Sequence, residues 1–206
     1  AYPSSVREVR FYTTLARKFR KSRFLLWLGT WLYWLIGNGF TRTPRLLNLP
    51  DIQREEPVVR LDDAQGGVEY SDAYLIDNDA RFVFNFVRSA INSGGIIANY
   101  VESTAATRGP DGYWTCEARD LIGGRSLRIR ARVLINACGP YVDAHNDKTG
   151  VGTRHKHVFS RGIHLLVNRI TEHTRVLTFF ADDGRLFFVI PMGPKSCVGT
   201  TDTRQE

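Results

Sequence analysis

Three side chains in the last quarter of the sequence could act on a polar ligand. His164 lies at the start of one apolar segment, Arg185 opens another, and Arg161 lies three residues before His164. A neutral imidazole can accept a proton near neutral pH, and a guanidinium group can bind phosphate through two parallel hydrogen bonds. Each residue also has an ordinary structural explanation: the histidine could pack within a strand, and the arginines could occupy strand ends.

Two glycine-containing turns could bring the backbone close to a ligand. Residues 135–140 read INACGP, and residues 199–202 read GTTD. Glycine lacks a Cβ, so its backbone can approach a bound molecule closely. Taken alone, the first turn could equally be structural packing, and the second could be an ordinary β-turn.

The segments that carry His164 and Arg185 are predicted to form an antiparallel sheet. Apolar runs at residues 163–167, 176–180, 185–190 and 196–200 are typical of strands. The sequence DDG at residues 182–184 predicts the hairpin turn that joins the second and third of these strands. We expect this sheet to belong to a second domain.

The middle of the chain is predicted to mix helices and strands. Apolar residues from Phe82 to Ile91 recur at helical spacing, after a cap at Asp77 or Asp79, and Gly94 ends the helix. Strands are predicted at residues 96–101, 103–107, 113–119 and 126–132. The apolar run at residues 133–137 predicts a buried parallel strand that enters the INACGP turn and a helix over residues 141–148.

The first 60 residues combine a basic segment with a short apolar run. Residues 6–21 are compatible with a helix, and the cations of this region are Arg7, Arg10, Arg17, Lys18, Arg20, Lys21 and Arg23. The apolar run at residues 24–37 is shorter than the roughly 20 residues that a membrane-spanning helix needs. Its Trp27, Trp31 and Trp34 share one helical face. Two interpretations remain open: a core helix, or an interfacial element on an anionic membrane surface.

Composition narrows the possible partners. The formal net charge is +7, which favours an anionic partner such as a phosphate compound, a phospholipid surface or nucleic acid. Arg128, Arg130 and Arg132 alternate with apolar residues, but no RNA-reading aromatic pattern accompanies them, so we expect no nucleic-acid binding. The three cysteines have no CxxC spacing, so neither a zinc site nor a disulfide framework is indicated, and a reducing cytoplasm fits best.

Four segments carry a joint resemblance to one enzyme family: VEYSDAYLIDNDARFVFNFVRSAINSGG (residues 68–95), INACGPYVD (135–143), SRGIHLLV (160–167) and RLFFVIPMGPKSCVGTTDT (185–203). Together they resemble the FAD-dependent, membrane-associated glycerol-3-phosphate dehydrogenases of the D-amino-acid-oxidase-like flavoprotein superfamily. The resemblance implies an α/β (α+β mixed) fold, with part of an FAD-binding Rossmann-like domain and an antiparallel-sheet substrate domain. It also implies oxidation of sn-glycerol 3-phosphate to dihydroxyacetone phosphate, with hydride transfer to FAD and electrons passing to a quinone.

The resemblance assigns roles to the three candidate catalytic residues. His164 matches a substrate-pocket histidine that could accept the hydroxyl proton, and Arg185 matches an arginine close to the substrate phosphate. Arg161 stands where lysine is more usual, so a cation is kept without the compact ammonium group. We expect His164 and Arg185 to be neighbours on a sheet that covers the cofactor beside Gly139.

The resemblance also assigns the cofactor contacts. Ala137, Cys138 and Gly139 match a strand-to-turn near the ribose and pyrophosphate, with cysteine where threonine or alanine is more usual. Val101 matches a position whose main chain brackets the adenine. Thr201 and Asp202 lie in the GTTD turn that is expected to approach the flavin or the substrate.

Three segments with different tasks are expected. Residues 1–60 would be a basic and apolar helical segment of the substrate or membrane-facing part, residues 61–150 an incomplete FAD-binding domain, and residues 151–206 part of the substrate domain. No GxGxxG follows a strand within these residues, so we expect this internal segment of a longer enzyme to bind FAD weakly or not at all and to be inactive alone.

Two alternative functions are also compatible with the sequence. An amine or amino-acid oxidase of the same superfamily would aim an arginine at a carboxylate, and a non-enzymatic membrane-surface module would rely on residues 7–37. The resemblance further implies a cytoplasmic enzyme, peripheral on the cytoplasmic membrane, and exposed apolar surface could drive self-association into a homodimer.

Overall fold

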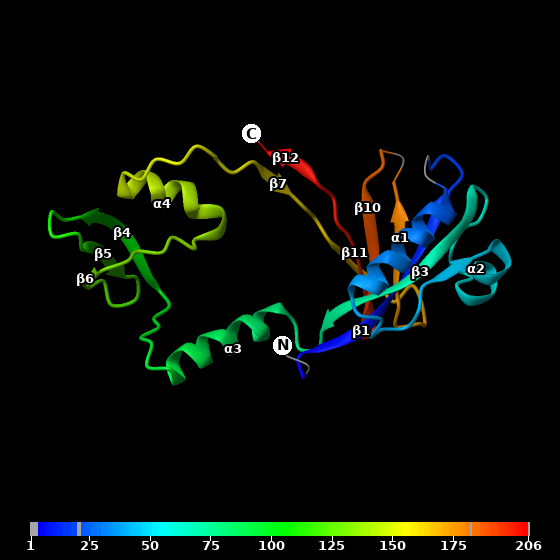
Figure 1. Ribbon diagram of the computed structural model, residues 1–206, viewed down its shortest axis with the longest axis horizontal. Helices are drawn as coiled ribbons and strands as arrows, with labels where there is room; N and C mark the ends of the chain where they lie inside the picture. The colour runs from blue at the N-terminus through cyan, green and yellow to red at the C-terminus, as the bar shows by residue number, and fades with distance from the viewer. Residues whose placement is uncertain (1–3, 20–21, 182, 206) are drawn as a thin grey trace. The chain divides into compact units, whose positions relative to one another are not determined.

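The structure is a computed structural model, and it describes residues 4–19, 22–181 and 183–205 (Figure 1). Arg20, Lys21 and Asp182, which the sequence assigned to the basic segment and the hairpin turn, lie outside the described residues. The elements are β1 (Val6–Ala16), α1 (Arg23–Ile36), β2 (Arg45–Leu47), α2 (Leu49–Glu55), β3 (Ala64–Leu75), α3 (Asp79–Asn92), β4 (Val101–Arg108), β5 (Trp114–Asp120), β6 (Ser126–Ala131), η1 (Gly139–Tyr141), α4 (Val142–Thr149), β7 (Phe159–Arg161), β8 (Leu165–Asn168), β9 (Val176–Phe180), β10 (Leu186–Met192), β11 (Lys195–Gly199) and β12 (Thr203–Gln205).

The chain forms two compact units. Unit 1 consists of Ala1–Phe82 and Ser160–Thr203, and unit 2 consists of Val83–Phe159 and Arg204–Glu206. Unit 1 therefore unites the N-terminal region with the strands that carry the candidate catalytic residues. The functional division into three segments stays a prediction.

A seven-stranded mixed sheet forms unit 1, in the order β2-β3-β1-β9-β10-β11-β8. Its neighbours are antiparallel except β1 and β9, which run parallel with Phe11 opposite Val176. The four strands predicted after residue 160 are confirmed as β8 to β11, with ends that agree within two residues. With the three-stranded antiparallel sheet of unit 2, this mixed sheet confirms the expected mixed α/β fold class.

The helix predicted for the basic segment is wrong, because Val6–Ala16 form β1, an interior strand of the sheet. This strand pairs with β3 on one side, from Val6 opposite Leu75 to Ala16 opposite Ala64, and with β9 on the other. Its valine, threonine and aromatic side chains favour a pleated sheet. The two long-range pairings therefore override the helical potential of the basic segment.

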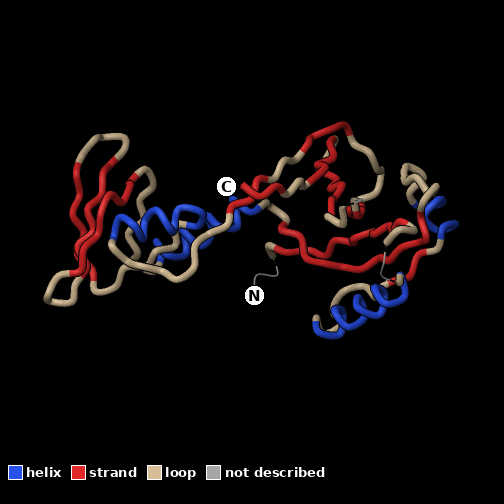
Figure 2. The backbone as a smooth tube through the Cα atoms, turned by 90° about the horizontal axis from the view of Figure 1, so that it is seen from above, coloured by secondary structure: helices blue, strands red, loops and turns tan. Residues whose placement is uncertain are grey.

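The two faces of the sheet are covered differently. One face buries Tyr12, Leu177 and Val189 against Leu47 and Ile52, which come from β2 and α2. The other face carries the aromatic side chains of Phe11 and Tyr70, whose rings stack at 5.4 Å, and α1 lies along it. Figure 2 shows a long helix running beside the strands of unit 1.

Helix α1 confirms the predicted helix over the apolar run. Ser22 caps it by accepting a hydrogen bond from the Phe24 backbone N–H. None of its residues is fully buried, and Trp27, Trp31 and Trp34 meet edge to face. Within the described residues, no helix has the length and apolar character needed to cross a membrane.

A buried ion-pair network lies on the face of the sheet opposite α1. Arg175 binds the carboxylates of Glu56 and Glu55, and its guanidinium lies 4.3 Å from the Tyr12 ring centroid. Arg45 bridges Glu55 and Glu69, at 2.6 and 2.9 Å. The Glu56 side chain is only 2% exposed, so its charge depends on these partners and on a 2.7 Å bond from Thr171.

The network predicts a loss of stability in acid. The two hydrogen bonds that Arg45 donates hold the pKa of Glu55 at about 2, below its ordinary value of 4.5. Because the folded-state pKa is depressed, the stabilisation is fully present above pH 4.5 and is lost as the pH falls toward 2. The free energy of unfolding in urea, measured at a series of pH values between 6 and 2, tests this prediction. Glu55→Gln should be less stable than the parent chain at pH 6, and this difference should shrink toward pH 2; a constant difference would contradict the assignment.

Unit 2 contains the antiparallel sheet β4-β5-β6, which confirms the predicted hairpins. Arg128 and Arg130 lie on its exposed face and pair with Glu117 and Asp111. Helix α4 confirms the helix predicted over residues 141–148 and ends at Gly150 in the left-handed conformation.

Helix α3 also confirms its prediction, with a different cap. Asn78, rather than Asp77 or Asp79, caps it, because the Asn78 side chain accepts a hydrogen bond from the backbone N–H of Arg81. Gly94 adopts φ of +85° after its last turn, as the sequence indicated.

The predicted parallel strand at residues 133–137 is wrong. These residues are irregular, and Val133 and Ile135 are 68% and 80% exposed. A parallel strand needs a neighbour for its backbone N–H and C=O groups, and no described strand of the chain pairs with this segment. Residues 96–100, expected to open a strand, are likewise irregular before β4 begins at Val101.

Candidate functional site

The imidazole of His164 lies against a glycine of the neighbouring strand. Leu165 pairs with Val198, so the next residues outward, His164 and Gly199, lie opposite each other. A Cβ at position 199 would come within 2.6 Å of His164 Cδ2. Only glycine at position 199 leaves space for the imidazole ring. The sequence predicted that the GTTD turn approaches a ligand, and it did not indicate this contact with His164.

The GTTD turn is tied to the segment that carries His164. Thr201 Oγ1 accepts a 3.0 Å hydrogen bond from the backbone N–H of Ile163, and Thr201 N–H donates to the Ile163 carbonyl at 3.3 Å. A Cβ on Gly162 would meet Thr200 Oγ1 at 2.5 Å, so these two segments pack without space between them. These contacts fix the position of the backbone on which His164 is carried.

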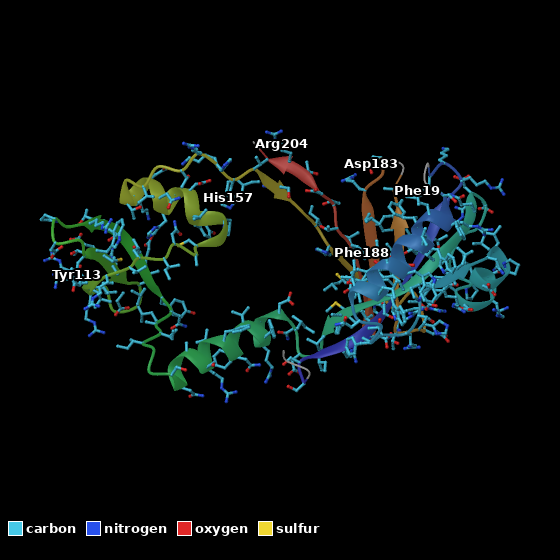
Figure 3. All side chains as sticks on the ribbon, in the orientation of Figure 1. Phe19, Tyr113, His157, Asp183, Phe188 and Arg204 are labelled. Atoms are coloured by element: carbon cyan, nitrogen blue, oxygen red, sulfur yellow. The ribbon has the colours of Figure 1, made fainter. Side chains whose placement is uncertain are left out.

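Arg185 follows the hairpin turn between β9 and β10, where Figure 3 labels Asp183. Its Nε donates to Asp183 Oδ2 at 2.7 Å, and its Nη1 donates to the Asp202 carbonyl at 3.5 Å. Hydrogen bonds from the Arg185 backbone and guanidinium lower the pKa of Asp183, so this carboxylate stays charged beside the cation. The guanidinium keeps donors free to bind an anion, because its side chain is 47% exposed.

Both His164 and Arg185 therefore contact the segment at residues 199–202, one near each end. Phe188 pairs with Gly199, so the side chains of Phe188 and His164 lie on the same face of the sheet. Arg185 lies three residues before Phe188. Because side chains alternate along a strand, that of Arg185 lies on the opposite face. Arg161 is exposed at the end of β7. The placement of His164 and Arg185 differs from the expected one, because their side chains lie on opposite faces of the sheet rather than side by side. Their binding to one substrate stays a prediction.

The candidate cofactor residues of unit 2 lie at an exposed turn. Ala137, Cys138 and Gly139 are exposed and lead into η1 and α4. Gly139 has φ of +53°, and a Cβ there would meet no atom within 4 Å, so a ligand has room to approach this backbone. Val101 is half-buried as the first residue of β4. This exposed turn is compatible with the backbone contacts that FAD would need.

The turn is held by Asn136, which sequence reasoning missed. Asn136 Nδ2 donates to the Val142 carbonyl at 3.0 Å and to Asn146 Oδ1 at 2.8 Å, while Asn136 Oδ1 accepts from Cys138 N–H at 3.2 Å. Asn146 is only 8% exposed. A polar residue inside the apolar run VLINA was the available signal, because a half-buried amide needs partners.

Asn136→Leu should destabilise unit 2. The substitution leaves the buried Asn146 oxygen and the Cys138 N–H without their partner, at a cost of about 2–3 kcal/mol in total. Chemical denaturation followed by the fluorescence of Trp114 on β5, in a background that carries phenylalanine at positions 27, 31 and 34, measures this loss. Asn99→Leu, at an exposed position, should change stability by less than about 0.5 kcal/mol. Equal effects of the two substitutions would refute the anchoring role.

The comparisons with known proteins agree with these features. The chain belongs to the FAD-dependent oxidoreductase family, whose pattern matches residues 8–206. This match confirms the flavoprotein class that the four sequence segments predicted.

The relatives narrow the resemblance further. The chain is 31% identical over 190 residues to an alpha-glycerophosphate oxidase of Streptococcus pneumoniae, which covers 88% of this chain and 31% of the relative. It is 31% identical over 168 residues to an aerobic glycerol-3-phosphate dehydrogenase of Staphylococcus haemolyticus, which covers 77% of this chain and 29% of the relative. The chain thus spans about a third of the length of these relatives.

A solved structure shows the same fold. The glycerol-3-phosphate dehydrogenase of Bacillus halodurans complexed with FAD superposes with a TM-score of 0.74 at 23% identity, over 99% of this chain and 36% of that one. The L-proline dehydrogenase of P. horikoshii follows with a TM-score of 0.68 at 11% identity, over 97% of this chain and 50% of that one. The predicted resemblance to the glycerol-3-phosphate dehydrogenases is confirmed.

Proposed function

We propose that the protein carrying this chain oxidises sn-glycerol 3-phosphate to dihydroxyacetone phosphate. The observation that supports this proposal is the exposed imidazole of His164, which rests on Gly199 at the start of the segment at residues 199–202. The guanidinium of Arg185 bonds to Asp202 at the other end of that segment, on the opposite face of the sheet. The names of the relatives, alpha-glycerophosphate oxidase and aerobic glycerol-3-phosphate dehydrogenase, supply the substrate class.

His164 is proposed to take the proton from the substrate hydroxyl. Its ring rests on Gly199 without a side chain between them, so its orientation is restricted by the neighbouring strand. Bound FAD would accept the hydride in this chemistry. Removal of the hydroxyl proton by a positioned base makes that transfer easier.

Arg185 is proposed to bind the phosphate, and Arg161 to add positive charge. Asp183 already occupies the Nε side of Arg185, so the substrate would bind through the Nη groups. This arrangement orients the guanidinium before the substrate arrives, which lowers the entropy lost on binding.

Steady-state kinetics of the purified protein that carries this chain, with sn-glycerol 3-phosphate as the substrate, test the role of Arg185. Arg185→Gln should raise KM roughly tenfold to a hundredfold, because one charge-assisted hydrogen-bonded contact is lost. Arg204→Gln serves as the matched control, since that exposed arginine lies beyond the segment at residues 199–202. An unchanged KM for Arg185→Gln would remove this residue from the phosphate site.

A quinone is proposed as the electron acceptor. FAD is proposed as the cofactor, with residues 137–139 and Val101 of unit 2 as its candidate contacts. The two names among the relatives, oxidase and dehydrogenase, differ in the acceptor that they imply. Parallel assays of oxygen uptake and of reduction of a soluble quinone would distinguish the two acceptors.

A peripheral location on an anionic cytoplasmic membrane surface is also proposed. Four leucines form an exposed stripe along α1, at one helical spacing: Leu25, Leu28, Leu32 and Leu35, each 53–61% exposed. Arg17 and Lys18 are exposed shortly before this helix, whereas Arg10 forms an ion pair with Glu69. Co-sedimentation with vesicles that contain or lack anionic lipid tests this location.

A further inference from the structure

The backbone that leads into His164 forms two hydrogen bonds with a single residue of the facing segment. Thr201 Oγ1 accepts from the Ile163 N–H at 3.0 Å, and the Thr201 N–H donates to the Ile163 carbonyl at 3.3 Å. A peptide unit is planar, so the unit that contains the Ile163 carbonyl also contains the nitrogen and the Cα of His164. Thr201 therefore restrains the peptide planes on both sides of Ile163, and the second of these planes carries His164.

Two glycines allow the two segments to come this close. A Cβ on Gly199 would lie 3.0 Å from the Ile163 carbonyl oxygen. A Cβ on Gly162 would lie 3.0 Å from the Thr201 carbonyl oxygen and 2.5 Å from Thr200 Oγ1. Real Cβ atoms almost never approach another heavy atom within 3.0 Å, so a side chain at position 162 would push the segments apart.

The hydroxyl groups of Thr200 and Thr201 both act on the protein backbone. Thr200 Oγ1 donates to the Thr201 carbonyl at 2.8 Å, next to the bonds that Thr201 forms with Ile163. Such local bonds from threonine side chains to the main chain favour one backbone conformation over its alternatives. The segment at residues 199–201 is thus a fixed surface against which the residues before His164 pack.

The position of this backbone matters for a base. A general base must come within about 2.6–3.2 Å of the atom that gives up the proton. A displacement of about 1 Å at such a group can lower the rate about a hundredfold. The His164 side chain is exposed, so its place depends on the backbone that carries it and on its contact with Gly199.

We infer that Thr201 is a positioning residue, whose two hydrogen bonds to Ile163 hold His164 within reach of the substrate hydroxyl. This role rests on the proposed function of His164 as the base of the reaction. Thr201 acts through the backbone of Ile163, so it should affect the rate of the chemical step more than the binding of the substrate.

Substitutions of Thr201 in the purified protein that carries this chain test the role, with kcat and KM measured for sn-glycerol 3-phosphate. Thr201→Val keeps the shape but cannot accept the hydrogen bond, so kcat should fall roughly ten- to a hundredfold while KM changes by less than about twofold. Thr201→Ser keeps the hydroxyl and should stay within about threefold of the parent kcat. A parent-like kcat for Thr201→Val, a loss confined to KM, or a Thr201→Ser enzyme as slow as Thr201→Val would refute the role.

A double variant shows whether Thr201 acts through His164. In a His164→Gln background, Thr201→Val should lower kcat by less than about twofold, because the group that it positions has been removed. A loss as large as in the parent background would overturn the role. If His164→Gln is slow and Thr201→Val is not, only the positioning role fails; if His164→Gln keeps the parent kcat, the proposed base fails and the positioning role fails with it.

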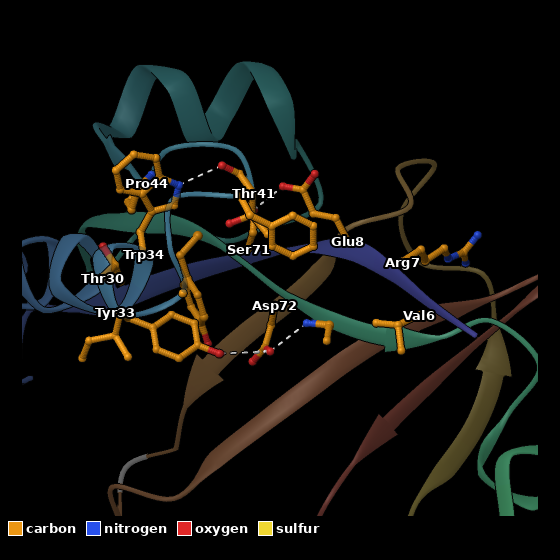
Figure 4. A pocket seen from close by; sticks show the side chains of 15 residues that line it. Val6, Arg7, Glu8, Thr30, Tyr33, Trp34, Thr41, Pro44, Ser71 and Asp72 are labelled. Carbon is orange, nitrogen blue, oxygen red and sulfur yellow. Dashed lines mark hydrogen bonds between the residues drawn. The ribbon is translucent and has the colours of Figure 1, made fainter. Parts of the chain in front are cut away.

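The matched control is Tyr33→Phe, which also removes one hydrogen-bonded hydroxyl from unit 1. Figure 4 shows Tyr33 Oη bonded to Asp72 at 3.2 Å, in a cavity of about 410 Å³ whose lining residues all lie between positions 6 and 73. This variant should keep kcat within about twofold of the parent value, since independent sites do not couple.

A glycine substitution tests the same contact without changing Thr201. Gly162→Ala should lower kcat, because its Cβ would press on Thr200 Oγ1, whereas Gly152→Ala, whose Cβ would meet no atom within 4 Å, should not. Circular dichroism checks that each variant folds. If Thr201→Val does not fold, Gly162→Ala decides: a folded Gly162→Ala enzyme with the parent kcat would overturn the role.

Discussion

Replacing His164 with glutamine is expected to lower kcat for sn-glycerol 3-phosphate roughly 100- to 10,000-fold, with little change in KM. This range is the usual contribution of a positioned general base. Glutamine cannot accept the hydroxyl proton, although it can still form hydrogen bonds of similar reach. The measurement is steady-state kinetics of the protein that carries this chain, together with its flavin absorbance.

The control for this substitution is His173→Gln, another exposed histidine of unit 1. Its kcat should stay within about twofold of the parent value, since no role in the reaction is proposed for it. Gly199→Ala offers an independent approach, because the new Cβ would displace the His164 ring from its place. A His164→Gln enzyme that keeps its kcat would show that another group takes the proton.

Replacing Arg175 with methionine is expected to destabilise unit 1 by about 3–5 kcal/mol. Removing one partner of a buried ion pair leaves the other charge unpaired, and that loss is far larger than the net contribution of the intact pair. Arg175 contacts three carboxylates and one aromatic ring: Glu55, Glu56, Glu69 and Tyr12. The free energy of unfolding is measured with urea, using the tryptophans of α1 as the fluorescent probe.

An exposed pair provides the matched control. Arg60 binds Asp62 at 2.7 Å, but the two side chains are 89% and 79% exposed, so Arg60→Met should cost less than about 1 kcal/mol. The double variant Arg175→Met with Glu56→Gln should recover part of the loss, because the uncompensated charge on Glu56 is then removed. Similar losses for Arg175→Met and Arg60→Met would show that burial does not govern this network.

Local patterns were sufficient where neighbouring residues determine the structure. Helix α3 follows from the spacing of its apolar residues and from Gly94, and the DDG turn predicted the β9–β10 hairpin, whose Gly184 has φ of +84°. The family could be recognised because four separate segments kept their residues and order. Each of these features depends on contacts within a short stretch of chain.

Long-range pairing decided the elements that the sequence reading missed. Residues Val6–Ala16 become a strand only because β3 and β9 lie on either side, and the run at residues 133–137 stays irregular because no described strand pairs with it. The side chains of Val6–Ala16 favour a strand, but the sequence of a segment does not show whether a neighbouring strand is present. Hydrogen bonds to a neighbouring strand, rather than propensity, determine whether an apolar segment becomes part of a sheet.

The candidate site likewise has features that the sequence determines and features that depend on long-range contacts. The sequence by itself determined the kinds of residue available, an imidazole at 164 and guanidinium groups at 161 and 185, together with the family to which they belong. The tertiary structure decided that Gly199 makes room for the imidazole, that Asp183 and Asp202 orient Arg185, and that Asn136 holds the turn before α4. These contacts join residues that register and packing bring together, and a register between strands is fixed only when the whole sheet forms.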